Sequence, residues 1–216
     1  MKKILKKKFI KTLKLKGIAY ALKISRLLFK KAQTTEELNL VYKTRYEIYK
    51  NEGYIKENKE KLFKDKYDPY SVNFIIFKNG KPLGTARLVF DSKIGFPTEN
   101  LFNFKKPEIN RKRTAEVSRL AIKKEFRGGD RLITMGLMKM IYDYTKKNNI
   151  EHLYVNMPER LREYFSRFGL HFQNLKEMSP TKANLKEREL IGGYFSQKKL
   201  KPYILDVKEM KQLLGL

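Results

Sequence analysis

Apolar residues recur at helical spacing after Thr34, which predicts a well-defined helix near the start of this chain. Thr34 and Glu37 have the spacing of a capping box. The stripe that follows consists of Leu38, Val41, Tyr42 and Tyr49. Arg45 falls in the middle of this stripe, where a guanidinium is costly unless a carboxylate or a ligand meets it. We therefore expect Arg45 to be paired and to form part of a site; the alternative is that its head reaches solvent at the stripe's edge.

Strands are predicted in the middle of the chain. Residues 72–77 and 83–90 are rich in β-branched and aromatic residues, and a hairpin turn at 78–81 joins them. Alternation along the second strand places Arg87 on a face that also carries apolar residues. The polar stretch before them, 53–71, predicts a long loop of the kind that often carries functional residues.

Residues 113–122 predict a further strand with polar groups on both faces. Strict alternation divides it into Glu116, Ser118, Leu120 and Ile122 on one face and Val117, Arg119 and Ala121 on the other. A carboxylate, a hydroxyl and a guanidinium within four residues make this strand a candidate for chemistry.

The second half alternates helices with strands. A basic loop at 123–131 leads into an amphipathic helix, and the segments that follow predict a strand at 151–157, a helix from Pro158 to Gly169, strands at 170–172 and 203–207, and a short final helix. This order predicts an α/β (α+β) protein with a central mixed sheet flanked by helices.

Charge is concentrated at the N-terminus. The chain has 216 residues and a net charge of +26, and residues 1–31 hold eleven lysines, one arginine and no acid. Loosely spaced apolar residues predict a helix over 3–30. This helix is expected to contact an anionic membrane or a partner protein; the alternative is that it packs on its own domain. The basic surface fits nucleic acid, anionic lipid or an acidic protein, and a lysine-rich proteome would also produce it.

Several classes of protein are excluded or disfavoured by composition. The absence of cysteine excludes disulfides, thiolate metal sites and a cysteine nucleophile, and two histidines are too few for a multi-histidine metal centre. No apolar run approaches the ~18 residues that span a bilayer, and no signal-peptide core follows the basic start. We expect a cytoplasmic protein, associated with membranes at most through residues 1–31. Nucleic-acid binding is disfavoured because the chain has no aromatic RNP signature or helix-turn-helix.

The loop at 123–131 is a candidate anion site. It joins a strand to a helix, and backbone N–H groups at such a junction can hold phosphate. Its candidate binding residues are Arg127, Gly128, Gly129 and Arg131. The alternative is a simple turn.

The order of strand, Arg-Gly-Gly loop, helix and strand, followed by REYFSRFGLHF, resembles the acyltransferase fold of the GNAT superfamily. We therefore expect two segments: a basic N-terminal helical segment over 1–31, which its charge defines, and a GNAT-like N-acyltransferase domain over 32–216, which the resemblance implies. The resemblance also implies that the loop lies near a phosphopantetheine-linked acyl donor. Gly128-Gly129-Asp130 departs from the usual glycine pattern of that loop, which counts against a coenzyme A diphosphate site.

Four motifs resemble more closely the acyl-homoserine-lactone synthases and the related N-acyl amino acid synthases. In order, YKTRYEIY supplies Arg45, DKYD supplies Asp65 and Asp68, LGTARLV supplies Arg87, and EVSRLAI supplies Glu116, Ser118 and Arg119. A tryptophan expected in the lactone synthases after the first helix is missing. The resemblance therefore implies transfer of a fatty acyl group from acyl-acyl carrier protein, or acyl-coenzyme A, to the amine of an amino acid. The alternatives are a lactone synthase that uses S-adenosylmethionine and a non-enzymatic basic nucleic-acid-binding protein.

The chemistry of acyl transfer assigns roles to these residues. Glu116 is the candidate general base, and a strand-edge N–H near Ser118 is a candidate oxyanion donor. We expect a cluster of ion pairs around the acceptor, formed by three cations (Arg45, Arg87 and Arg119) and three anions (Asp65, Asp68 and Glu116). The alternative is that these ion pairs are purely structural. We expect an acidic acyl carrier protein to dock on the basic residues near the loop, which are Lys123, Lys124, Arg127 and Arg131. No metal and no tightly bound cofactor are expected.

Overall fold

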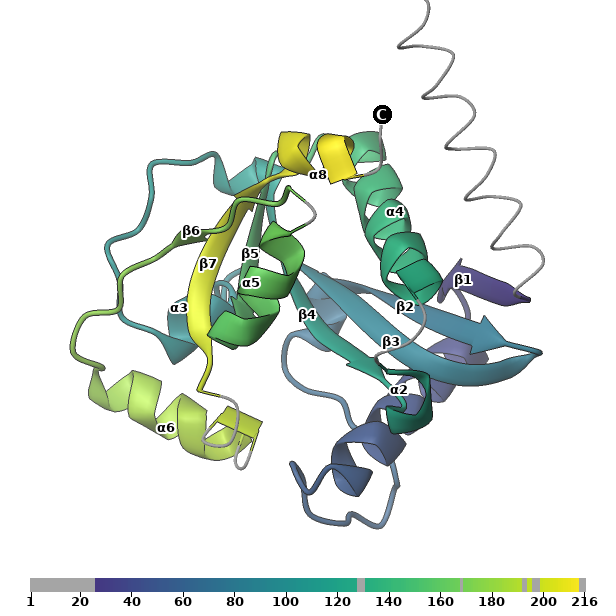
Figure 1. Cartoon of the computed structure of the whole chain (residues 1–216). Helices are drawn as coiled ribbons and strands as arrows, with labels where there is room; N and C mark the ends of the chain where they lie inside the picture. The colour runs from purple at the N-terminus through teal and green to yellow at the C-terminus, as the bar shows by residue number, and fades with distance from the viewer. Residues whose placement is uncertain (1–25, 128–130, 168, 192–193, 196–198, 214–216) are drawn as a thin grey trace, which may run out of the picture.

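A seven-stranded sheet forms the middle layer of the protein (Figure 1). The computed structural model describes residues 26–127, 131–167, 169–191, 194–195 and 199–213. The strand order is β1-β2-β3-β4-β5-β7-β6. The bounds are Leu27–Lys31 (β1), Ser71–Lys78 (β2), Lys81–Phe90 (β3), Thr114–Ile122 (β4), His152–Met157 (β5), Gln173–Asn174 (β6) and Lys201–Asp206 (β7). The expected mixed sheet is confirmed.

Helices cover both faces of this sheet. Side chains of α4, α5 and α8 join the largest apolar cluster on one side, whereas α2 and α3 belong to two smaller clusters. The bounds are Thr35–Asn51 (α2), Pro97–Leu101 (α3), Arg131–Lys147 (α4), Glu159–Ser166 (α5), Lys182–Ile191 (α6) and Val207–Leu213 (α8). The predicted cap of α2 is present, since the Thr34 hydroxyl accepts from the backbone N–H of Glu37 at 3.3 Å.

Strands β1 to β4 pair antiparallel, and the β2–β3 hairpin has the predicted turn. Asn79 and Gly80 both have positive φ angles, 51° and 74°, as the favoured two-residue hairpin turn requires. The β4–β5 pair is parallel and short, because its register runs only from Thr114 opposite His152 to Val117 opposite Val155. Beyond that point the two strands diverge (Figure 1).

Two predictions are corrected by the strands. Residues 27–31 form strand β1, which pairs with β2, so the helix expected over 3–30 does not extend through them. Residues 1–25 lie outside the described part of the chain. The strand expected at 170–172 is instead the two-residue β6 at 173–174. Helices α3 and α6 were not predicted.

None of the helices in the described part of the chain combines the length and the hydropathy of a membrane-spanning segment.

Candidate active site

A cavity opens beside the point where β4 and β5 separate. The empty space within it, counted together with its opening to solvent, is about 540 Å³. Four residues expected at the site line it: Arg87, Glu116, Ser118 and Arg119. Further lining residues are Tyr49 from α2, Tyr67 from the loop before β2, Asn156 from β5, Glu187 from α6, and Tyr194.

Asp65 joins two of the predicted arginines. Arg87 donates from Nη1 to Oδ1 of Asp65 at 2.7 Å, and Arg119 donates from Nη2 to Oδ2 at 2.6 Å. Burial by itself would raise the pKa of Asp65, but the charges of Arg119 and Arg87 hold that pKa well below its usual range. Asp65 is therefore a permanent anion between two cations.

Arg45 is anchored beneath this pair. Its side chain is fully buried, and its Nη1 lies 3.1 Å from Oδ1 of Asp68 while its Nη2 donates to Oδ1 of Asn73 at 2.6 Å. Asp68 also lies 3.1 Å from Nη1 of Arg87, so it bridges the two arginines. The expectation that Arg45 is paired is confirmed.

A β-bulge changes the predicted faces of β4. Arg119 has a positive φ of 50°, and the β3–β4 register shifts between Thr85 and Arg87. As a result Ser118 and Arg119 both reach the same site: Ser118 accepts from Nε of Arg87 at 3.0 Å, and Arg119 binds Asp65. Leu120 and Ile122 pack against the main core and Ala121 against the α2 side, the reverse of strict alternation.

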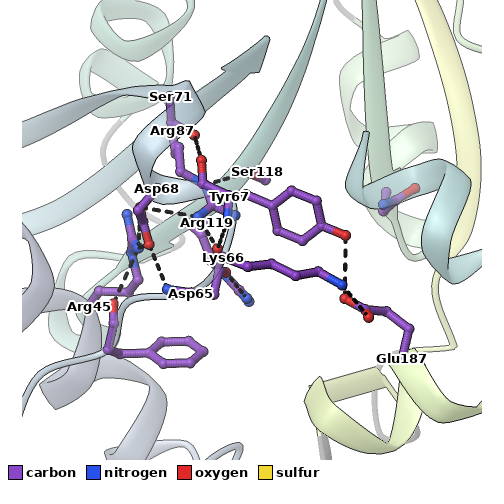
Figure 2. A network of polar contacts seen from close by, with 12 residues as sticks. Arg45, Asp65, Lys66, Tyr67, Asp68, Ser71, Arg87, Ser118, Arg119 and Glu187 are labelled. Carbon is purple, nitrogen blue, oxygen red and sulfur yellow. Dashed lines mark hydrogen bonds and ion pairs between the residues drawn. The ribbon is translucent and has the colours of Figure 1, made fainter. Parts of the chain in front are cut away.

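The ion-pair cluster contains two acids rather than the three expected. Figure 2 shows Asp65 and Asp68 among Arg45, Arg87 and Arg119. Three guanidinium charges against two carboxylates leave the cluster with a net charge of +1. Glu116 is not one of its ion pairs, so the predicted pairing of Glu116 within the cluster is wrong.

Glu116 lies apart, in a neutral hydrogen-bonded setting. Its side chain is 1% exposed. Oε2 accepts from the backbone N–H of Thr98 at 2.8 Å, and Oε1 accepts from Nδ2 of Asn156 at 3.2 Å. Burial raises the pKa of Glu116 to about 7, with the Thr98 bond acting in the opposite direction. A carboxylate with a pKa near neutrality can both take and release a proton during turnover.

Tyr67 and Glu187 form another wall of the cavity. Tyr67 donates to Oε1 of Glu187 at 3.3 Å and accepts from Nδ2 of Asn100 at 2.9 Å. Lys66 reaches the same carboxylate at 2.6 Å, as Figure 2 shows. Burial and the negative charges of Glu187 and Glu116 raise the pKa of Tyr67, so its phenol stays protonated. These contacts tie α6 to the loop that carries Asp65.

An aromatic group surrounds the head of Arg119. The guanidinium carbon lies 4.6 Å from the ring centre of Phe63 and 5.7 Å from that of Tyr49. Tyr194 packs on Tyr49 with ring centres 5.5 Å apart. This end of the cavity therefore combines a cation with apolar ring surface.

The predicted donor loop is only partly described. Arg127 donates to Oε1 of Glu52 at 2.8 Å and to the carbonyl of Ile122 at 2.7 Å. Gly128 and Gly129 lie outside the described residues, and Arg131 begins α4. Lys123 pairs with Glu47 at 3.3 Å, and Lys124 is exposed. Within the described ranges, no group of three or more acidic or histidine side chains could hold a metal ion.

Sequence reasoning missed several residues of the site, among them Tyr67, Asn73, Thr98, Asn156, Glu187 and Tyr194. Asn73 and Asn156 carried a usable signal, since each is a polar residue inside an otherwise apolar strand. Thr98 and Glu187 lie on helices that the pattern did not predict, so they carried none.

Comparisons with known proteins agree with this geometry. A model of the family "N-acyl amino acid synthase FeeM" matches residues 40–184. No curated protein sequence matches the chain at a significant level.

Solved structures share the fold at low sequence identity. The acyl-homoserine-lactone synthase LasI superposes with a TM-score of 0.68 and 18% identity, over 88% of this chain and 96% of that one. FeeM, an N-acyl amino acid synthase from uncultured soil microbes, gives 0.58 and 14%, over 87% and 94%. The CoA-dependent acyl-homoserine-lactone synthase BjaI, solved with SAM and isopentyl-CoA, gives 0.61 and 15%, over 83% and 82%.

Proposed function

Because the chain belongs to the FeeM family of N-acyl amino acid synthases, we propose that it transfers a fatty acyl group from acyl-acyl carrier protein to the amine of an amino acid. Membership of this family makes the protein an acyltransferase with a GNAT-like fold. The identity of the donor and of the acceptor is the part that we propose.

One observation carries the proposal: a buried carboxylate with a pKa near 7 shares a cavity with a surplus positive charge. Glu116 has the first property, and the cluster of three arginines and two aspartates has the second. An amino acid presents an ammonium and a carboxylate two bonds apart. Its carboxylate suits Arg87 and Arg119, and its ammonium suits Glu116.

The reaction then follows from the placement of these groups. Glu116, directly or through one water, takes a proton from the ammonium, and the free amine attacks the thioester carbonyl. The N–C bond forms and the C–S bond breaks. The nitrogen gives up a second proton to the departing thiolate, which leaves as the thiol of the phosphopantetheine. Pairing of β4 with β5 ends at Val117, and we expect a backbone N–H near Ser118, beyond that point, to stabilise the developing oxyanion.

An acidic carrier protein is the proposed partner because the chain is strongly basic. Exposed Lys124 and half-exposed Lys123 flank the start of the loop that leads to α4. Pairing of Arg127 with Glu52 means that its charge is partly neutralised before any partner arrives.

A lactone synthase using S-adenosylmethionine is the second candidate. The likeness to LasI favours it, and S-adenosylmethionine offers the same ammonium and carboxylate to Glu116 and Arg119. Absence of tryptophan from this chain counts against it. The non-enzymatic nucleic-acid-binding alternative loses its support because the family is one of enzymes.

A product survey separates the two candidates. The purified full-length protein is mixed with carrier protein loaded with acyl chains of several lengths, the twenty amino acids and S-adenosylmethionine, and products are identified by mass spectrometry. An acyl amino acid supports the proposal and names both substrates. A lactone instead would replace it with the second candidate. A parallel set with acyl-coenzyme A tests the donor.

A further inference from the structure

Three hydrogen bonds around Glu116 form a closed triangle. The Thr98 N–H, in the first turn of α3, donates to Oε2 at 2.8 Å, and Asn156 on β5 donates from Nδ2 to Oε1 at 3.2 Å. The third bond joins the two donors to each other, because the Thr98 hydroxyl donates to Oδ1 of Asn156 at 3.0 Å. Each oxygen of the carboxylate therefore receives a donor from a different element.

The carboxylate of Glu116 determines which end of the amide faces it, because an ionised carboxylate only accepts hydrogen bonds. An asparagine side chain can present either its oxygen or its nitrogen to a neighbour. With Nδ2 facing the carboxylate, Oδ1 is left to accept from the Thr98 hydroxyl, which can rotate to donate to it. A reversed amide would place Oδ1 against a carboxylate oxygen, two acceptors with no proton between them.

The position of Asn156 in the sheet explains how it reaches Glu116. The β4–β5 ladder ends at Val155, and Asn156 is the next residue, paired on its other side with Pro202 of β7. Glu116 is opposite Tyr154 in the β4–β5 register, and Asn156 is two residues further along β5, so its side chain lies on the same face as that of Tyr154. From this diagonal position its Nδ2 reaches the carboxylate of Glu116.

On the basis of the proposed function, we propose that Asn156 and Thr98 are positioning residues that hold the carboxylate of Glu116 in one orientation and set its basicity. Donors to a carboxylate favour its charged form, so they offset the effect of burial. Without them the base would be protonated at neutral pH and unable to accept a proton from the acceptor.

Other charged and titratable groups face Glu116 and stay unchanged in the test. Arg87 on β3 favours the ionised form and Glu99 on α3 disfavours it. Burial raises the pKa of Tyr154 on β5 to about 12 and also raises that of Tyr67, so both act as neutral phenols. The variants below change only the two donors.

Three variants remove or change the hydrogen bonds around Glu116, and the pH profile of kcat/KM is measured for each. Asn156→Asp puts a second carboxylate beside Glu116, which should move the acidic limb to higher pH by about one unit or more. Asn156→Ala removes one donor and should move it in the same direction by less. Thr98→Val keeps the backbone N–H but removes the hydroxyl, which both lowers the pKa of Glu116 and holds the amide of Asn156, so we again expect a movement to higher pH.

Matched controls separate positioning from general damage. Thr145→Val removes another buried hydroxyl, which donates to the carbonyl of Tyr142 at 2.8 Å on α4. Asn39→Asp makes the same amide-to-acid change on an exposed position of α2. Both control variants should leave the acidic limb of the pH profile unchanged. Thermal unfolding of every variant checks that the variant is folded.

A second measurement does not depend on the proposed function. The side-chain carboxyl carbon of Glu116 is titrated by NMR in the substrate-free protein, with Glu116→Gln identifying the signal. Raised midpoints in the Asn156 variants support the positioning role even if no acyl amino acid is ever detected, which would overturn only the proposed function. Midpoints equal to the wild type in folded Asn156→Asp and Thr98→Val would overturn the inference.

Discussion

At the residue scale, the site contains two acidic residues, Asp65 and Glu116, whose environments shift their pKa values in opposite directions. Asp65 is surrounded by Arg87 and Arg119, which hold its pKa well below its usual range and keep it ionised. Glu116 lacks an ion-pair partner among the described residues and its pKa rises to about 7. The first acid therefore positions cations, whereas the second can exchange a proton. Neighbouring carboxylates with such divergent environments typically have separate roles.

Activity should rise with pH through the pKa of Glu116. The base must be ionised to accept a proton, so kcat/KM should increase as pH rises through about 7. Glu116→Gln should reduce kcat by on the order of 100-fold or more, within the range of general-base contributions. A pH–rate series on both proteins checks this. A Glu116→Gln enzyme with full activity would show that another group is the base.

The same residue should make folding stability depend on pH. Its folded-state pKa of about 7 exceeds the unfolded value of 4.5, so ionisation destabilises the fold progressively as pH rises between these values. Relative to wild type, Glu116→Gln should gain on the order of 3 kcal/mol between pH 4.5 and 8, at about 1.4 kcal/mol per pKa unit. Urea unfolding at the two pH values measures the gain. A stability difference that does not change with pH would contradict the raised pKa.

Arg119 is expected to act on acceptor binding. Arg119→Met removes the surplus charge of the cluster, since two arginines would then face two aspartates. The KM for the acceptor should rise about tenfold or more, in line with the ~1.5–3 kcal/mol of a hydrogen bond to a charged group, with a smaller effect on kcat. Arg113→Met is a suitable control, because that exposed arginine pairs with Glu151 outside the cavity. A loss confined to kcat would indicate that Arg119 does not bind the acceptor.

At the element scale, the limits of sequence prediction are visible in β4. Arg45 and Glu116 could be found because each is a charge within an apolar pattern. The faces on which Ser118 and Arg119 lie could not be predicted, because a β-bulge shifts the alternation and the local sequence pattern does not indicate it. Glu187 and Thr98 depend on α6 and α3, whose positions come from tertiary contacts with the loop and with β4.

Strand β1 and helix α4 pack so closely at Gly136 that a single added methyl group would meet the ring of Phe29. A Cβ on Gly136 would lie 2.3 Å from Cζ of Phe29. Gly136→Ala should therefore cost about 1–3 kcal/mol from overpacking, partly offset by the ~1 kcal/mol higher helix propensity of alanine. Chemical denaturation measures the cost, and it should fall sharply in a Phe29→Leu background. An equal cost in both backgrounds would show that Phe29 does not oppose the added methyl group.

At the scale of the whole molecule, the sheet begins before residue 31, where the sequence analysis placed the boundary between the basic segment and the domain. Strand β1 belongs to the sheet, and Leu27 is 8% exposed within the main core. Residues 1–25 carry nine lysines and no acid, which leaves +17 of the net +26 on the rest of the chain. A basic segment adjoining an edge strand is suited to bring the enzyme to an anionic surface, where an acylated product would partition.

We propose that residues 1–25 bind anionic membrane, and deletion of these residues tests it while sparing β1. Each lysine near such a surface contributes about 1 kcal/mol, so the deletion should weaken sedimentation with phosphatidylglycerol vesicles by at least tenfold and leave kcat/KM with soluble substrates unchanged. A full-length variant with the nine lysines replaced by glutamine keeps the length and loses the charge; it should behave like the deletion. Vesicles of phosphatidylcholine alone should bind none of the three proteins. If the deleted protein sediments as well as the full chain, the remaining +17 is sufficient for binding and the role of the segment lies elsewhere.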